Sequence, residues 1–312
     1  MRMLDIAKMY VSMNVYQEET QKQVLRASAL FDERAGIEDV NDIDYAAIHR
    51  FKTCNLDVLR IKAVTHNGYL RYLKLLGRWA TKVELIERNW FKHVTLAPQP
   101  VAPHKTLDSE VFAQAFQYLK RHPDALKPAW FWMIVIRFLY YTGIRRRQLV
   151  NIEWQDLDLG ARVLVASYRG SKTHRQWEIP LAADLIDDLE YLIRRDSDAL
   201  GRPMQEGDRV FNVCRFHPKY KPDPRNQGAM RPEQVTGFFK QLSKKTGMRI
   251  GAHRIRHTTA TALCNPEGDE EGPDLFAVQH LLGHTTLSTT RGYVKTRLHR
   301  VERQVNRLSL PK

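Results

Sequence analysis

The chain has 312 residues, of which 43% are hydrophobic and 27% are charged, and this balance indicates a folded globular protein rather than a disordered one. The formal net charge of +14 favours a polyanionic partner, because cations that contact phosphates release counterions. No run approaches the roughly 20 apolar residues that a membrane span needs, and the start lacks a secretory pattern. We therefore expect a cytoplasmic protein without a membrane partner.

The three cysteines of the chain are widely spaced and include no CxxC pair; they are Cys54, Cys214 and Cys264. This usage predicts neither a disulfide framework nor a cysteine-rich zinc site. We expect free thiols in a reducing compartment and no bound metal.

The first third of the chain is predicted to be helical. Apolar residues recur at helical spacing within residues 17–31, 45–51 and 66–81. On the third of these helices four cations fall at spacings of three and four, which places them on one face: Arg71, Lys74, Arg78 and Lys82. Two interpretations explain this face equally well. It is either a solvated surface or a DNA-binding face that follows the phosphate backbone. The second interpretation predicts these four residues as DNA-binding.

A proline-rich stretch divides the chain. Three prolines lie within residues 96–104, and such a run cannot continue a helix and favours an extended linker. The sequence therefore predicts a helical domain at residues 1–95, a linker at 96–105 and a second domain at 106–312.

The second domain is predicted to be mainly α with a small antiparallel β-sheet. Asp108 is a candidate N-cap, Pro128 begins a buried apolar helix that Gly143 ends, and Pro232 occupies a first helical position. The expected helices cover residues 109–120, 129–141, 145–151, 182–195, 233–245 and further segments to the end, including a tail helix at 296–309. The expected strands are 162–167 and 176–180, and a long basic loop is expected at 201–231.

Four short segments concentrate side chains that suit phosphoryl transfer: residues 142–149, the turn around Lys172, residues 253–257 and residues 281–293. An arginine fork can bind two phosphate oxygens, a histidine can move protons near neutral pH, and a tyrosine can form a covalent intermediate. Each residue alone has an ordinary structural explanation. The order and spacing of the whole set favour a catalytic site.

These segments resemble the catalytic boxes of the tyrosine recombinase family, which includes phage integrases and Xer recombinases. The sequences Thr-Gly-Ile-Arg at 142–145, His-Arg-Ile-Arg at 253–256 and Leu-Gly-His at 282–284 carry the resemblance, with a tyrosine nine residues later. The catalytic residues that it implies are Arg145, Lys172, His253, Arg256, His284 and Tyr293. The sequence departs from the family pattern at Gln148, where an acidic residue is usual, and at Lys172, whose turn lacks the common Gly-Lys-Gly form.

The resemblance implies a transesterification. Tyr293 would attack a DNA phosphate and form a 3′-phosphotyrosyl bond, while the two arginines hold the non-bridging oxygens. His253 would assist proton removal, His284 would hydrogen-bond the phosphate, and Lys172 would protonate the leaving 5′-oxygen. One ester replaces another and side chains supply the cations, so neither ATP, a metal nor another cofactor is expected.

The resemblance also implies how the enzyme engages DNA. The two domains would form a C-shaped clamp around double-stranded DNA, a core-binding domain at 1–95 facing a catalytic domain at 106–312, and Arg254 would add charge near the DNA. The tail helix at 296–309 would dock on a neighbouring protomer to give a tetramer on two DNA sites. Packing of the tail on its own domain is the alternative.

Three other functions compete with a recombinase. A type IB topoisomerase-like relaxase shares the arginine and tyrosine chemistry, but the Leu-Gly-His box and the short first domain argue against it. A catalytically silent DNA-binding protein on the same fold would show a damaged constellation, whereas all six positions are filled here. An RNA-binding protein would need stacking aromatics on an exposed sheet, which one small sheet does not offer.

Overall fold

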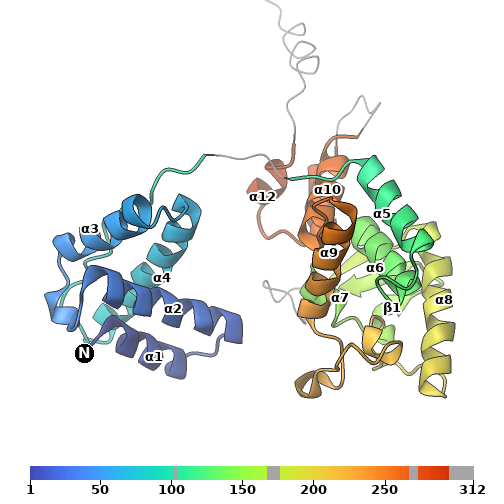
Figure 1. Cartoon of the computed structure of the whole chain (residues 1–312), viewed down its shortest axis with the longest axis horizontal. Coiled ribbons are helices and arrows are strands. Elements are labelled where there is room, and N and C mark those ends of the chain that lie inside the picture. Colours follow the sequence, from blue (N-terminus) through green and yellow to red (C-terminus); the bar gives the residue numbers. More distant parts are fainter. Residues whose placement is uncertain (101–104, 167–175, 267–272, 295–312) are drawn as a thin grey trace, which may run out of the picture. The chain divides into compact units, whose positions relative to one another are not determined.

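A computed structural model describes residues 1–100, 105–166, 176–266 and 273–294. Lys172 and the predicted tail helix at 296–309 lie outside these described residues. The chain separates into two compact units, Met1–Ala102 and Pro103–Lys312, each with its own hydrophobic core (Figure 1).

The first unit is built from four α-helices around an apolar centre. Leu70, Leu73 and Leu76 of the last helix are fully buried or nearly so, and they pack in one core cluster with Phe31 and Phe51. The α-helices are α1 (Met3–Met13), α2 (Glu18–Ala35), α3 (Tyr45–Thr53) and α4 (Ala63–Lys82), with a 3-10 turn at η1 (Val40–Asp42) and a π-turn at η2 (Cys54–Val58).

Helix α1 was not expected from the sequence, although its apolar residues follow helical spacing. Met3, Ile6 and Tyr10 are buried against the rest of the unit, and the Tyr10 ring meets the Trp79 ring of α4 at 5.2 Å between centroids. The Asp32 carboxylate accepts hydrogen bonds from the backbone N–H groups of residues 3 and 4. The first backbone N–H groups of a helix have no partner within the helix, and the two Asp32 oxygens accept from two of them in α1.

The beginning of the predicted linker is fastened to this unit. The Asn67 side-chain amide donates to the Ala97 carbonyl at 2.9 Å, and the Ala97 N–H donates back to the Asn67 amide oxygen at 2.9 Å. A paired contact of this kind mimics one step of a β-ladder, so the chain leaves the first unit from a fixed point.

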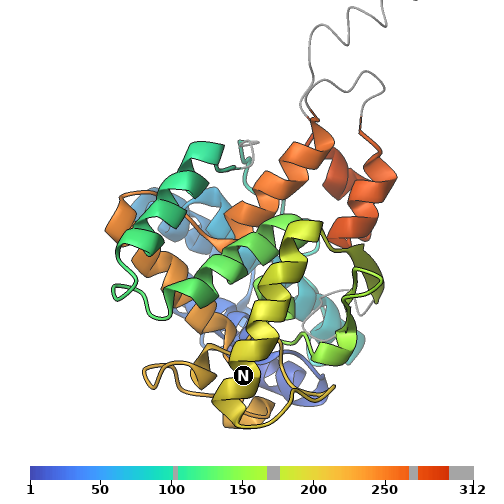
Figure 2. The same ribbon diagram turned by 90° about the vertical axis from the view of Figure 1, so that its right-hand side faces the viewer.

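The second unit is mostly helical (Figure 2). Its described α-helices are α5 (Ser109–Arg121), α6 (Ala129–Thr142), α7 (Arg146–Leu149), α8 (Ala183–Leu200), α9 (Pro232–Thr246), α10 (Ala252–Cys264), α11 (Leu275–Leu282) and α12 (Leu287–Arg291). The beginnings of α5 after Asp108, of α6 after Pro128 and of α9 at Pro232 confirm the predicted positions, although the Asp108 side chain makes no capping hydrogen bond.

Helix α6 is the centre of the second unit. Most of its side chains are buried, and it packs against α5, α8 and α10. Its Trp132 ring stacks on Phe238 of α9 at 4.2 Å between centroids and 4° between planes. Because α6 is apolar nearly all round, it requires neighbours on every side, and its end at Gly143 is consequently held in place.

A small antiparallel sheet in the order β1-β2-β3 lies beside these helices. The strands are β1 (Leu157–Asp158), β2 (Val163–Ala166) and β3 (Trp177–Pro180), and Leu164 pairs with Ile179. Strands β2 and β3 confirm the two expected strands, whereas the two-residue β1 was not expected. The mainly α fold with a small antiparallel sheet is therefore confirmed.

The segment predicted as a long loop at 201–231 is part of the core. Val210, Phe211 and Met230 are fully buried, and the segment contains 3-10 turns at η4 (Val213–Arg215) and η5 (Pro224–Asn226). Such short turns give no helical or strand periodicity, so the pattern of the sequence did not reveal their burial.

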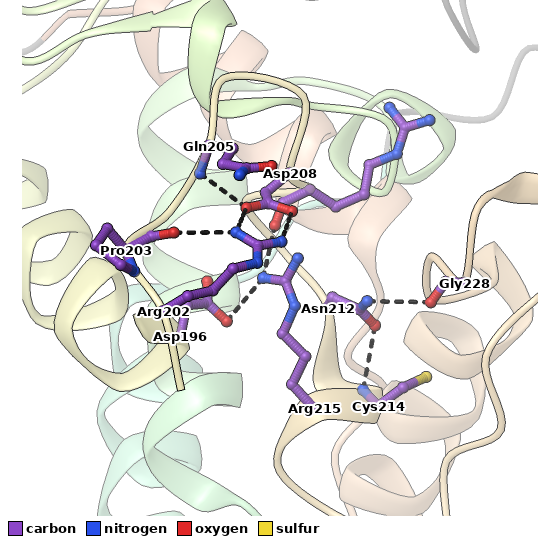
Figure 3. A network of polar contacts seen from close by, with 10 residues as sticks. Asp196, Arg202, Pro203, Gln205, Asp208, Asn212, Cys214, Arg215 and Gly228 are labelled. Atoms are coloured by element: carbon purple, nitrogen blue, oxygen red, sulfur yellow. Dashed lines mark hydrogen bonds and ion pairs between the residues drawn. The ribbon is translucent and has the colours of Figure 1, made fainter. Parts of the chain in front are cut away.

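One ion pair lies within this segment and another joins it to α8 (Figure 3). Arg202 donates two hydrogen bonds to the Asp208 carboxylate, at 2.7 and 2.8 Å, and this contact lowers the pKa of Asp208 to about 2. Arg215 lies 2.8 Å from the buried Asp196 of α8. Burial nevertheless raises the pKa of Asp196 to about 7, because desolvation outweighs the attraction of Arg215.

Within the described residues, none of the helices has the length and apolar character of a membrane-spanning segment. The three cysteines, all within the described residues, are free thiols.

Glycines in the left-handed conformation end several helices of the second unit. Gly201 ends α8 with φ +65°, and a Cβ built there would meet no atom within 4 Å. Gly283 ends α11 with φ +57°, and a Cβ there would lie 2.5 Å from a ring carbon of Trp177. The two positions share the same backbone constraint, but only Gly283 is also closely packed.

We predict that Gly283→Ala destabilises the protein more than Gly201→Ala does. Gly201→Ala should cost about 1 kcal/mol for the left-handed backbone alone. Gly283→Ala should cost a further ~1–3 kcal/mol, because the new methyl overlaps the Trp177 ring. Urea unfolding of the two variants measures the difference, and equal losses would show that Trp177 moves aside freely.

Candidate active site

Arg145 lies in the turn between α6 and α7. Gly143 ends α6 in the left-handed conformation, and the chain then places Arg145 immediately before α7, where the Arg145 N–H donates to the Gln148 side-chain oxygen at 3.2 Å. Gln148 thus accepts the backbone hydrogen bond that an acidic residue at this position would accept. Among the described residues, the buried Nη1 of Arg145 has no hydrogen-bond partner.

Arg256 on α10 connects two helix ends. Its Nη1 donates to the Gly143 carbonyl at 2.5 Å, and its Nη2 donates to the Leu282 carbonyl at 2.7 Å. The side chain is only 4% exposed. Burial and, to a smaller extent, the nearby Arg145 lower its pKa to about 9, while Tyr293 acts in the opposite direction. The guanidinium still carries its charge near neutral pH.

His284 follows the end of α11 and is held from two sides. Trp177 of β3 covers the Gly283 turn and donates its indole N–H to the Leu281 carbonyl at 3.1 Å. The His284 Nδ1 lies 3.0 Å from the Thr290 hydroxyl. Burial lowers the pKa of His284 to about 4, with smaller contributions from the two arginines and from His257. The imidazole is therefore neutral at physiological pH.

Tyr293 is positioned by the turn that follows α12. Its N–H donates to the Thr290 carbonyl at 3.0 Å, and its carbonyl accepts from the Asn265 side chain at 2.9 Å. The ring lies parallel to the His284 ring, with 6.0 Å between centroids. Burial raises the pKa of the phenol, and Arg256 and Arg145 act in the opposite direction.

The hydroxyl of Tyr293 contacts His257, which the sequence analysis did not select. The His257 Nδ1 lies 2.8 Å from this hydroxyl, and the His257 Nε2 lies 2.8 Å from the Nε2 of His253. The spacing of four in His-Arg-Ile-Arg-His was the available signal, because residues four apart share one face of a helix.

The structure brings four of the predicted catalytic residues together: Arg145, Arg256, His284 and Tyr293. His253 is exposed and joins them through His257, and Lys172 lies outside the described residues. Of the predicted DNA-binding residues, Arg71, Arg78 and Lys82 are exposed on α4, Lys74 is half-buried there, and the half-buried Arg254 donates to the Arg249 carbonyl at 3.1 Å.

The assembled cluster is suited to binding an anion. Both arginines lie close enough to influence the Tyr293 phenol, and one buried N–H group of Arg145 lacks a partner among the described residues. A buried cation of this kind is costly unless an acceptor satisfies it. A phosphate placed before the phenol would supply oxygens to the arginines and an electrophile to the tyrosine.

Comparisons with known proteins agree with this geometry. The model of the phage integrase family matches residues 105–300. A Pseudomonas aeruginosa relative, provisionally named tyrosine recombinase XerC, is 28% identical over 292 residues, which are 89% of this chain and 65% of that protein. A Pseudomonas syringae relative with the same provisional name is 30% identical over 251 residues, which are 77% of this chain and 50% of that protein. The chain thus spans half to two thirds of the length of these curated relatives.

Solved structures show the same fold. The integrase of transposon Tn1549, in complex with a circular intermediate DNA, aligns with a TM-score of 0.74 and 18% identity over 99% of this chain and all of that one. A lambda integrase dimer bound to a COC′ core site aligns with a TM-score of 0.65 and 18% identity over 94% of this chain and 76% of that one. The match of the family model to most of the chain, with the fold of these integrases, shows that the chain belongs to the phage integrase family.

Proposed function

We propose that this protein is a site-specific DNA recombinase that cuts and rejoins duplex DNA through a 3′-phosphotyrosyl intermediate. The observation that carries the proposal is a pair of guanidiniums near the Tyr293 phenol, the buried Arg256 and the half-buried Arg145, with the buried Nη1 of Arg145 unpaired among the described residues. The DNA-bound integrases of the same fold and the XerC relatives support it.

In the proposed reaction the Tyr293 oxygen attacks a scissile phosphorus and displaces the 5′-oxygen of the next nucleotide. Arg145 and Arg256 hold the non-bridging oxygens and stabilise the charge that develops on them in the transition state. The neutral His284 donates a hydrogen bond to the phosphate from the ring nitrogen that does not face Thr290. The phenolic proton leaves toward the histidines of α10, and Lys172 protonates the leaving oxygen.

The exchange replaces one phosphodiester bond with another, so its free energy is nearly balanced and no ATP is required. The two arginines supply the positive charge that a divalent metal supplies in many phosphoryl transfers. We therefore propose that the reaction needs no added metal or other cofactor.

The two units have separate roles in this proposal. Residues 1–95 form a core-binding domain, residues 96–105 a linker, and residues 106–312 the catalytic domain, which together form a C-shaped clamp around double-stranded DNA. Arg71, Lys74, Arg78 and Lys82 on α4, together with Arg254, contact the phosphate backbone. Because its substrate is DNA and its three thiols are free, we place its action in the cytoplasm.

The tail at residues 296–309 is proposed to hold the protomers together on DNA. We propose that its apolar residues dock on a neighbouring catalytic domain and produce a tetramer on two DNA sites. A lambda integrase tetramer bound to a Holliday junction, which has the same fold, supports this arrangement.

The first test traps the covalent intermediate. Wild-type protein, incubated in EDTA with a nicked DNA that carries a candidate site, should form a denaturation-resistant adduct, and Tyr293→Phe should form none because it lacks the nucleophilic oxygen. Arg256→Gln should lower the rate by about 10²–10³-fold, as the loss of one oxyanion donor does elsewhere. Absence of an adduct on DNA that the wild type binds would favour a silent DNA-binding protein, and relaxation of DNA without joining of partners would favour a topoisomerase-like relaxase.

The α4 face should contribute to binding without selecting sequence. Replacing Arg71, Arg78 and Lys82 with Gln should weaken binding to every duplex and reduce the slope of log affinity against log salt by about one for each lost phosphate contact. Lys8→Gln with Lys22→Gln is the matched control, because these exposed lysines already face Asp5 and Glu18. If both sets change the slope equally for each cation removed, the α4 face is an ordinary solvated surface.

Removal of residues 297–312 should abolish the tetramer on DNA and leave adduct formation by single protomers intact. Sedimentation of protein–DNA complexes measures the assembly. An unchanged tetramer would show that the tail packs on its own domain.

A further inference from the structure

Two histidines of α10 form a chain that begins at the nucleophile. The Tyr293 hydroxyl lies 2.8 Å from Nδ1 of His257, and Nε2 of His257 lies 2.8 Å from Nε2 of His253. The two nitrogens of an imidazole point to different sides of the ring. His253 therefore lies beyond His257 as seen from the phenol.

The hydrogen positions in this chain are coupled. Only one hydrogen can lie between the two Nε2 atoms, so one imidazole donates and the other accepts. When Nδ1 of His257 accepts from the phenol, its Nε2 carries the hydrogen and donates to His253. His253 then accepts at Nε2, and its own hydrogen is on Nδ1.

We propose that His257, rather than His253, takes the proton from the Tyr293 hydroxyl, and that His253 passes this charge on to solvent. The inference rests on the proposed function. As the O–P bond forms, the phenolic proton moves to Nδ1 of His257, and the proton on Nε2 of His257 moves to Nε2 of His253. His257 ends neutral, His253 ends as an imidazolium, and no other reactant is required.

The burial of Tyr293 means that a relay is needed to carry its proton to solvent. Tyr293 is only 6% exposed, whereas His253 is exposed at the surface of α10. Arg256 and Arg145 both act on the Tyr293 phenol, whose hydroxyl contacts His257, and the neutral His284 after α11 also interacts with His257. A proton kept on His257 would be repelled by both arginines. Transfer to His253 moves the positive charge away from them and into water.

The contact between the phenol and α10 is supported by the backbone. Asn265 at the end of α10 donates to the Tyr293 carbonyl at 2.9 Å, and the Cys264 thiol lies 3.8 Å from the Thr290 carbonyl. The segment that carries the nucleophile is therefore attached to the helix that carries both histidines. This attachment keeps the phenol within reach of His257.

The experiment compares His257→Asn with His253→Asn, and exposed His122→Asn at the end of α5 is the matched control. Single-turnover adduct formation is measured against pH on two DNA substrates, one natural and one with sulfur in place of the leaving 5′-oxygen. A thiolate leaves without a proton, so the sulfur substrate reports the attacking side of the reaction. Thermal unfolding shows whether each variant is folded.

We expect His257→Asn to lower the rate by about 10²-fold or more on both substrates, the range of general base catalysis. Its rate should rise steadily with pH, because the phenol must then ionise without a base. His253→Asn should lower the rate by a smaller factor, and His122→Asn should leave it unchanged. Lys172→Ala should be rescued by the sulfur substrate, whereas His257→Asn should not.

Several results would overturn the relay. They are an equal or larger loss in His253→Asn, rescue of His257→Asn by sulfur, or a His257→Asn pH profile parallel to that of the wild type. If His257→Asn does not fold, His257→Ala supplied with free imidazole replaces it, and a rate that imidazole leaves unchanged rejects the relay. A wild type that forms no adduct rejects the proposed function itself, whereas a normal wild type with an unimpaired His257 variant rejects only the relay.

Discussion

The geometry of the site depends on one buried guanidinium. Arg256 donates to the Gly143 carbonyl at the end of α6 and to the Leu282 carbonyl at the end of α11. Helix C-termini present unpaired carbonyls and a partial negative charge, so a cation between two such ends satisfies both. Arg145 follows Gly143 by two residues, and His284 follows Leu282 by two. A single side chain therefore fixes how far apart these two groups lie, and the left-handed glycines 143 and 283 provide the turns that direct them into the site.

The charges of the site favour the binding of an anion. Each arginine loses solvation, and Arg145 lowers the pKa of Arg256 in addition to burial. The carbonyls of Gly143 and Leu282 that accept hydrogen bonds from Arg256 are neutral, so they hold the cation without neutralising it. His284 adds no charge, because burial lowers its pKa to about 4. The positive potential thus comes from the two guanidiniums, whose planar forks match phosphate oxygens.

The sequence predicts the helix boundaries best where backbone chemistry determines them. Pro128, Gly143 and Pro232 mark the ends that the structure shows, because proline and glycine act locally. Helix α1 has no such marker, and the segment 201–231 is buried through short turns without a period. The cluster of Arg145, Arg256, His284 and Tyr293 followed from motif order. The role of His257 did not, because its contact with the phenol depends on the path of the chain through α12 and on side-chain rotamers.

Tyr293, the proposed nucleophile, is anchored more weakly than Arg256. Arg256 is bonded to the ends of two helices, one of which belongs to the central α6. Tyr293 packs in a small separate apolar cluster with Ala260, Cys264, Val278 and Leu282, after a five-residue helix. Local opening is easiest where few apolar contacts are lost. The proposed covalent intermediate would require Tyr293 to remain bonded to a phosphate that moves between DNA strands. Arg256 is fixed by the core, whereas Tyr293 packs in the smaller apolar cluster. A fixed phosphate-binding arginine and a tyrosine that can move are therefore carried by different parts of the unit.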